Sequence, residues 1–405
     1  MEKITLNKWV NGFIFVITMW LLSRLVIIVA MQLIAPFIAS LHHTLPAPSP
    51  ASSGYPMPLG SVPGFVPTSG WELFSHWDGA WYRKIATSGY DYANDGWQHS
   101  VEFFPLFPLI TRGVMTLGLP FEVAGTFVNN LAFLGALLLL YRWAKECHGI
   151  SAARWATAVL AWCPFSLFGT VIYTEGLFLL LTTAALQAFD KRQHARAALW
   201  GAMATATRPT GSMLVPTFLL VAWKERRPTS AYIAGLATSG GLLLFFMYCA
   251  IRFADPLAFV HVQRAWQQPN WLNILADALN LFKDGHVQRT WQQPNGLNIL
   301  WDALNLVKDS WIKIVMVFGG CYLLWHSRAK LPLVAIVYGF CSFALLLTSG
   351  ALGSINRYAF GIVSLSLALG VLLARHPWWG FTTIGWFAVL LVRYSIRFAL
   401  WQWAG

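Results

Sequence analysis

Apolar runs alternate with short polar segments along most of the 405 residues of this chain. Several runs approach or exceed the roughly 20 residues needed to cross a hydrocarbon core of about 30 Å. Because backbone in lipid must satisfy its own hydrogen bonds, such runs are expected to be helices. The pattern predicts one all-α domain over residues 1–405, a polytopic transmembrane helical protein with about nine spans plus a broken-helix hairpin.

The polar segments between the runs are mostly basic, and they predict the orientation of the chain. Lys and Arg cluster on the cytoplasmic side of membrane proteins, which places the N-terminus there. The apolar run after MEKITLNKW is too long for a signal-peptide core, so we expect a retained first span. The expected spans lie near residues 13–38, 123–143, 156–172, 232–251, 312–324 and 331–347, with another between Glu175 and Asp190 and two more on either side of residues 375–376.

Residues 197–223 lie between two basic clusters, so both of their ends are expected on the same side of the membrane. A single span cannot have that topology. Arg208, Pro209 and Gly211 interrupt the apolar pattern near its middle, which predicts a hairpin of two short helices. The broken backbone would then be satisfied by protein or by a water-filled cavity. Arg208 at the break is a candidate contact for an anion.

Two long segments are expected outside the cytoplasm, residues 41–108 and residues 252–310. The first begins with a Pro-, Ser- and Gly-rich stretch that no regular helix accommodates. The second contains a tandem repeat of 25 residues, 261–285 and 286–310, with 20 positions identical. Two copies are too few for a solenoid. Apolar spacing in each copy predicts an amphipathic helix on the membrane surface, and we expect one copy to face the site.

Composition agrees with a membrane protein, because 57% of the residues are hydrophobic and 11% are charged, against roughly 25% charged residues in soluble domains. The net charge of +12 comes from the loop clusters. Without a basic stripe elsewhere, it does not indicate nucleic-acid binding. The five cysteines show no CxxC or Cys/His ligand spacing, so neither a disulfide framework nor a zinc site is predicted.

Chemistry is expected in residues 71–108, which carry five of the sixteen acidic residues. Asp78 stands among aromatic residues at the start of an expected helix. Partial desolvation would raise its pKa and suit it to act as a general base. A helix N-cap explains the same residue equally well. Glu72, Asp91 and Asp95 are expected to be ordinary solvated loop carboxylates.

Other charged residues are candidate contacts for a substrate phosphate. His76 and Arg83 lie near Asp78, although an anchoring role at the membrane surface is favoured for Arg83. Glu175 begins an expected helix, where the helix dipole favours a carboxylate. Arg357 can hold a lipid phosphate bidentately. Arg24, inside the first span, is either functional, snorkelling, or paired with a carboxylate on another helix.

Several blocks of the chain, taken together and in order, resemble the PIG-V family, whose eukaryotic members add the second mannose to the GPI anchor. The blocks are HWDGAWYRKIATSGY (76–90), FFPLFP (103–108), CPFSLFGTVIYTEGLF (163–178), ATATRPTG (204–211), DPLAFVHVQRAW (255–266) and INRYAF (355–360). The resemblance extends from the first span to about residue 370. The Pro-rich loop and the second repeat copy depart from the family pattern.

The resemblance implies a GT-C glycosyltransferase that moves a hexose, mannose before others, from a polyprenyl-phosphate-sugar donor to a lipid or glycan acceptor. The reaction would occur on the extracytoplasmic side of a bacterial plasma membrane or of the endoplasmic reticulum. By resemblance, Asp78 is the base in a direct inverting displacement, and Glu175 and Arg208 fall in the other blocks. Cationic groups such as His76, Arg208 and Arg357 would stabilise the departing phosphate, so the scheme requires no metal or other cofactor.

A polytopic transporter or lipid flippase is the alternative from another class, and a catalytically silent scaffold is a third. Transporters typically carry an inverted repeat and charged residues at mid-membrane. Here the repeat is a local tandem one in a loop, and the acidic residues cluster outside the expected spans. The pattern therefore favours the enzyme.

Overall fold

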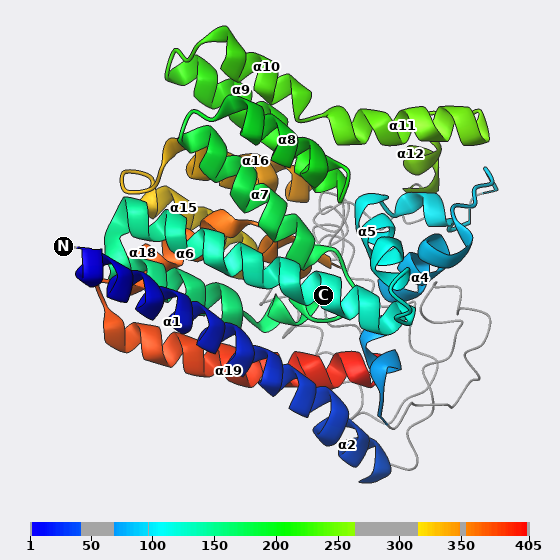
Figure 1. The fold of residues 1–405 in the computed structure, drawn as a ribbon, viewed down its shortest axis with the longest axis horizontal. Coiled ribbons are helices and arrows are strands. Elements are labelled where there is room, and N and C mark those ends of the chain that lie inside the picture. Colours follow the sequence, from blue (N-terminus) through cyan, green and yellow to red (C-terminus); the bar gives the residue numbers. More distant parts are fainter. Residues whose placement is uncertain (1, 42–68, 96, 264–314, 349–353, 403–405) are drawn as a thin grey trace, which may run out of the picture.

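The computed structural model describes residues 2–41, 69–95, 97–263, 315–348 and 354–402. These residues form helices joined by turns and contain no strand, which confirms the predicted all-α class. The long helices lie side by side, and the short helices α4, α5 and α12 gather at one end of them (Figure 1). The Pro-rich segment 42–68 and all of the tandem repeat beyond residue 263 lie outside the described residues.

The bundle consists of helices of very different lengths. The longer helices are α1 (Glu2–Val29), α6 (Phe121–Trp162), α7 (Glu175–Asp190), α8 (His194–Thr205), α11 (Gly240–Phe253), α16 (Leu333–Thr348) and α19 (Pro377–Ala399). The shorter ones are α2 (Ala35–Leu41), α4 (Asp78–Ser88), α5 (Leu106–Met115), α9 (Leu214–Lys224), α10 (Thr229–Ala237), α12 (Ala258–Gln263), α15 (Gly320–Ser327), α17 (Ile355–Phe360) and α18 (Val363–Leu373). Short 3₁₀ or π segments are η1 (Ala30–Ile34), η2 (Trp71–Ser75), η3 (Ser100–Glu102), η4 (Pro164–Gly169), η5 (Pro209–Met213) and η7 (Val315–Gly319).

The long helices have the length and surface of membrane spans. In the described parts of the chain, four helical stretches are long and apolar enough to cross a membrane: Val10–Ser40, Phe121–Trp162, Thr229–Phe253 and Pro377–Ala399. Ile14, Leu21 and Leu25 on α1 each expose more than half of their surface. An apolar surface of this kind is stable against lipid rather than water. The chain is therefore an integral membrane protein, while the number and orientation of its spans stay predictions.

The connections between α9 and α10, between α15 and α16 and between α18 and α19 lie along the end of the bundle opposite to α4 and α5 (Figure 1). Gly149, with φ 84° and ψ 179°, breaks α6 into two rods at this end. Beside it, Lys191 and Glu146 form an ion pair of 2.6 Å, and the Trp143 indole donates to Asp190 at 3.0 Å. These contacts hold the end of the first rod of α6 against the turn between α7 and α8.

The predicted hairpin within residues 197–223 is confirmed. α8 and α9 are separated by η5, and the start of α8 meets the residues after α9 through a hydrogen bond of 2.9 Å between His194 Nδ1 and Ser230 Oγ. At the break, the carbonyl of Ala206 accepts a hydrogen bond of 3.1 Å from the N–H of Leu106. Protein therefore satisfies part of the backbone that the break exposes.

The predicted helical span over residues 156–172 is wrong in its second half. The helix ends at Trp162, because Cys163 precedes Pro164 and is forced out of the helical conformation. Residues 164–174 continue as η4 and an irregular stretch, all of it buried. This stretch leads directly into Glu175 and shapes the site described below.

Within the described part of the chain, Arg24 contacts neither the membrane surface nor a carboxylate on another helix, the two partners expected from the sequence. Its guanidinium is buried and donates to the Ser166 carbonyl and hydroxyl, each at 3.0 Å, and to the carbonyl of Ala161 in the last turn of α6 at 3.4 Å. Carbonyls at the end of a helix lack intrahelical partners. Arg24 therefore completes the broken end of α6 inside the bundle, where a carboxylate or the membrane surface had been expected.

Candidate active site

Four charged side chains from separate segments form a buried cluster at the end of the bundle that carries α4. Arg357 Nη1 lies 2.5 Å from Asp78 Oδ2, and Arg357 Nε lies 3.3 Å from Glu175 Oε1. Arg208 also pairs with Glu175 Oε1. Each residue exposes 8% of its surface or less. Two negative and two positive charges compensate one another, which offsets the cost of removing them from water.

Aromatic rings surround the two guanidinium groups. The Tyr358 ring centre lies 4.9 Å from the guanidinium carbon of Arg208 and 5.4 Å from that of Arg357. The Tyr173 ring lies 5.2 Å from the Arg357 carbon. Such rings stabilise cations by their negative faces. Nothing in the sequence pattern pointed to a role for Tyr173, although it stands two residues before Glu175 in one of the blocks behind the family resemblance.

Asp78 is the first residue of α4, and its side chain points into the cluster. The N-cap residue is Trp77, so the interpretation of Asp78 as a helix cap is wrong. Trp77 has φ 56° and ψ −118°, a conformation that costs a non-glycine residue about 1–3 kcal/mol. The N–H of Asp78 donates to the Tyr173 hydroxyl at 3.4 Å. The strained turn and this contact direct the carboxylate inward, and Arg357 supplies its counter-charge.

The other two residues predicted near Asp78 lie apart from the cluster. His76 Nδ1 donates to the Phe398 carbonyl at 3.0 Å, and its ring stacks on Trp401 with centroids 3.9 Å apart. Burial lowers the pKa of His76 to about 4, so the ring is neutral at pH 7. Arg83 pairs with Glu122 at the surface, with 47% of its side chain exposed. The anchoring role favoured for Arg83 stays a prediction.

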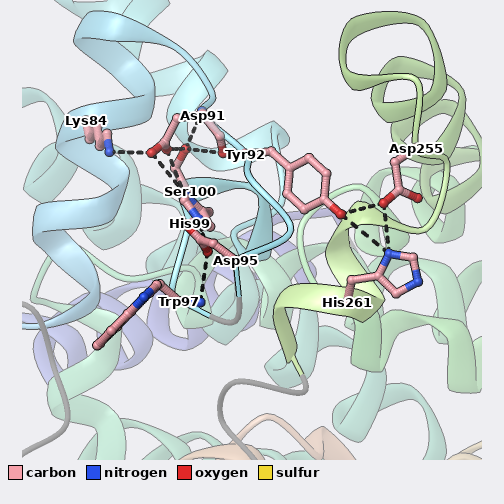
Figure 2. A network of polar contacts seen from close by, with 9 residues as sticks. All are labelled: Lys84, Asp91, Tyr92, Asp95, Trp97, His99, Ser100, Asp255 and His261. Carbon is pink, nitrogen blue, oxygen red and sulfur yellow. Dashed lines mark hydrogen bonds and ion pairs between the residues drawn. The ribbon is translucent and has the colours of Figure 1, made fainter.

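The loop after α4 carries a second polar network, so Asp91 and Asp95 are accessible to solvent as expected but are not isolated (Figure 2). Asp91 pairs with Lys84 at 2.7 Å and accepts hydrogen bonds from Ser100. The pKa of Asp91 lies below its usual range, because the hydrogen bonds from Lys84 and Ser100 outweigh burial, which raises it. His99 joins the network through Asp95, with 2.9 Å between Nε2 and Oδ1. Glu72 is exposed as expected.

The same loop contacts the segment that begins the second expected extracytoplasmic loop. Figure 2 shows the Tyr92 hydroxyl pointing at Asp255, to which it donates at 2.5 Å, and His261 bonded to the same carboxylate oxygen at 2.8 Å. Burial, followed by the hydrogen bond to Asp255, raises the pKa of Tyr92 to about 12. We call these three residues the loop junction. Within the described ranges, no group of three or more His, Cys, Asp or Glu side chains is arranged to hold a metal ion.

Comparisons with known proteins agree with the sequence blocks. The sequence profile of the family described as Mannosyltransferase (PIG-V) matches residues 11–224, just over half of the chain. The matched region contains Asp78, Glu175 and Arg208, whereas Arg357 lies beyond it. The human GPI alpha-1,6-mannosyltransferase 2 is 28% identical over 152 residues, which are 35% of this chain and 30% of that protein. A GPI mannosyltransferase 2 from Cryptococcus neoformans is 30% identical over 148 residues, 33% of each chain.

The chain thus spans about a third of the length of the curated relatives that it matches. Among solved structures, ArnT from Cupriavidus metallidurans bound to undecaprenyl phosphate is similar with a TM-score of 0.53 and 15% sequence identity. The similarity covers 94% of this chain and 63% of the ArnT chain. It confirms the fold class predicted from sequence, a GT-C-like bundle of transmembrane helices.

Proposed function

Because the chain belongs to the mannosyltransferase (PIG-V) family, we propose that it is a membrane glycosyltransferase that moves mannose from a polyprenyl-phosphate donor to a lipid or glycan acceptor. The buried pairing of Asp78 with Arg357 carries this proposal. A carboxylate and a guanidinium in contact, shielded from water, supply a base for the acceptor and a cation for the phosphate of the donor. The undecaprenyl phosphate bound to the similarly folded ArnT supports a donor of this class.

Each charged residue has a distinct role in the proposed reaction. Asp78 takes the proton of the acceptor hydroxyl as its oxygen attacks the anomeric carbon of the sugar. The bond between that carbon and the phosphate oxygen breaks, and its electrons leave with the phosphate. Arg357 and Arg208 stabilise the negative charge that develops there. Because attack and departure occur on opposite faces of the carbon, the configuration inverts.

The geometry leaves room for the base to act. The ion pair with Arg357 uses Oδ2 of Asp78, and no hydrogen bond to Oδ1 occurs among the described residues. Oδ1 is therefore the oxygen that receives the acceptor proton in this scheme. Glu175 forms ion pairs with both arginines through Oε1, and in this scheme it does not contact the sugar. It holds the two cations together, which makes it a positioning residue.

Transfer of radiolabelled mannose tests the proposal. Polyprenyl-phosphate mannose with a labelled sugar and a membrane lipid extract would be added to purified protein in liposomes. The labelled products would then be counted. We expect Asp78→Asn to lose at least about 100-fold in rate, the lower end of the range for a removed general base. The control is Glu146→Gln, a carboxylate in the turn at the opposite end of the bundle, which should transfer as the wild type does.

Each result has a definite meaning. Transfer that survives in Asp78→Asn, with the protein folded, would remove Asp78 as the base. If the wild type transfers no sugar from any polyprenyl-phosphate donor, the enzyme is not of this donor class, and transport or flipping of labelled lipid between leaflets is the next measurement.

A further inference from the structure

The irregular stretch between α6 and α7 is buried without the hydrogen bonds of a regular helix. Residues 164–174 are all buried, and backbone polar groups there must find other partners. The N–H of Ile172 donates to the Phe74 carbonyl at 2.8 Å, and that of Tyr173 donates to Val171 at 2.8 Å. Side chains from α6 supply much of the remainder.

Asn129 is the main such side chain. Its amide nitrogen donates to the Phe168 carbonyl at 2.7 Å and to the Val171 carbonyl at 2.6 Å. Its amide oxygen accepts from the N–H of Gly176 at 2.9 Å. One fully buried amide thus bonds the stretch both before and after Glu175.

The contact between α6 and the start of α7 is also close. A Cβ added to Gly176 would lie 2.4 Å from the Asn129 carbonyl oxygen and 2.5 Å from its side-chain oxygen. Only glycine fits this approach, so the backbone on both sides of Glu175 is held against Asn129. Oε1 of Glu175 forms ion pairs with both Arg208 and Arg357, while Oε2 is buried without a hydrogen-bond partner in the described parts of the chain.

We propose that Asn129 is a positioning residue for sugar transfer, which acts by placing Glu175 where its carboxylate holds Arg208 and Arg357 beside Asp78. This inference rests on the proposed function. Arg208 and Arg357 both pair with Oε1 of Glu175, and Arg357 also pairs with Asp78. A small displacement of Glu175 therefore displaces Arg208 and changes how Arg357 is shared between the two carboxylates, and these are the two groups that face the donor phosphate. Misplacement by about 1 Å at an active site can cost about 100-fold in rate.

Asn129→Asp is the test variant, because it is nearly isosteric. It keeps an oxygen for the Gly176 N–H and removes the donors to Phe168 and Val171. The matched control is Asn130→Asp. Asn130 lies on the same helix, and among the residues that the structure describes its amide donates to the Thr126 and Thr170 carbonyls alone, at 2.8 and 3.0 Å, before the stretch reaches Glu175.

The kinetic measurement is a double-mutant cycle with Glu175→Gln, on protein in liposomes with polyprenyl-phosphate mannose. We expect Asn129→Asp to lower kcat/KM for the donor about 10- to 100-fold, with KM for the acceptor unchanged. In the Glu175→Gln background the same substitution should cost less than about threefold, since its effect passes through Glu175. Asn130→Asp should stay within about threefold of the wild type.

A second measurement needs no turnover. Binding of polyprenyl phosphate without sugar would be titrated by tryptophan fluorescence for the same variants. The coupling between Asn129→Asp and Glu175→Gln obtained from the Kd values should match the coupling obtained from kcat/KM. Losses that add in the double variant, or an equal loss in Asn130→Asp, would show a general structural role and overturn the inference. A wild type that transfers mannose while Asn129→Asp is unchanged would overturn the inference alone. A wild type that neither transfers nor binds would overturn the proposed function and the role of Asn129 with it.

Discussion

Asp78 and Arg357 lie 279 positions apart in the sequence, yet Asp78 Oδ2 and Arg357 Nη1 are 2.5 Å apart in a buried ion pair. Asp78 begins α4, and Arg357 belongs to α17 near the opposite end of the chain. The region matched by the family profile ends well before Arg357. The charge that completes the cluster therefore comes from the second half of the chain.

Removing Arg357 is expected to destabilise the protein more than removing the whole pair. In Arg357→Met, the carboxylate of Asp78 stays buried without its partner, which costs about 3–5 kcal/mol of unfolding free energy. Adding Asp78→Asn should recover much of that loss, because the uncompensated charge is gone. Unfolding in mild detergent, followed by circular dichroism, measures both variants against Arg328→Met at an exposed turn. A single variant as stable as the double one would contradict this account.

His76 is expected to make stability fall as the pH is lowered from 7 toward 4. Its pKa is lowered by burial to about 4, from an ordinary value of 6.5. Between pH 6.5 and pH 4, His76 binds a proton in the unfolded chain but not in the folded protein. The stabilisation present above pH 6.5 is therefore lost as the pH falls. The full effect is about 3 kcal/mol. His76→Asn keeps a donor for the Phe398 carbonyl and cannot titrate, so its melting temperature should depend less on pH over this range. Equal slopes would count against a buried neutral His76.

Gly176→Ala is expected to displace the start of α7. The added methyl group would meet the Asn129 carbonyl at 2.4 Å, and forcing a group into a packed site costs about 1–3 kcal/mol. Gly113 in α5 is the control, because a Cβ there meets no atom within 4 Å. Gly113→Ala should be neutral or stabilise the helix by up to about 1 kcal/mol. Thermal unfolding of both variants makes the comparison, and similar melting temperatures would refute the close approach.

Tyr92→Phe is expected to loosen the loop junction without unfolding the bundle. The substitution removes the donor to Asp255, a contact of about 1 kcal/mol, and leaves the ring against Phe253, 5.6 Å away between centroids. Hydrogen exchange of peptides within residues 253–263 should quicken, while exchange in α7 should not. Tyr322→Phe, at an exposed position of α15, is the control.

The same junction should weaken in acid. Hydrogen bonds from Tyr92 and His261 outweigh burial and lower the pKa of Asp255. A lowered carboxyl pKa contributes stability above the ordinary value of about 4 that is lost as the pH falls below it. Exchange within residues 253–263 should therefore rise below pH 4 in the wild type and less so in Tyr92→Phe. An equal rise in both proteins would show that the junction does not respond through this contact.

Local chemistry made much of the fold predictable from the sequence. Apolar length located the helices, and Arg208, Pro209 and Gly211 located the break of the α8 and α9 hairpin. These signals act over a few residues, where Pro removes a donor and Gly permits an unusual conformation. The same rules, applied to Cys163 and Pro164, end α6 at Trp162, whereas apolar length alone predicts a helix that continues to residue 172.

What the charged residues contact could be decided only by the tertiary structure. The sequence identified Asp78, Glu175, Arg208 and Arg357 singly as candidates, and it favoured surface anchoring for Arg83. It contained no signal that Arg357 would neutralise Asp78, that Arg24 would bind backbone carbonyls, or that Asn129 would hold the stretch before Glu175. Apolar pattern and turn chemistry are read from neighbours along the chain, whereas a buried charge pairs with whatever helix packing brings within a few ångströms. That is why the sequence determined the helices and the tertiary structure decided the site.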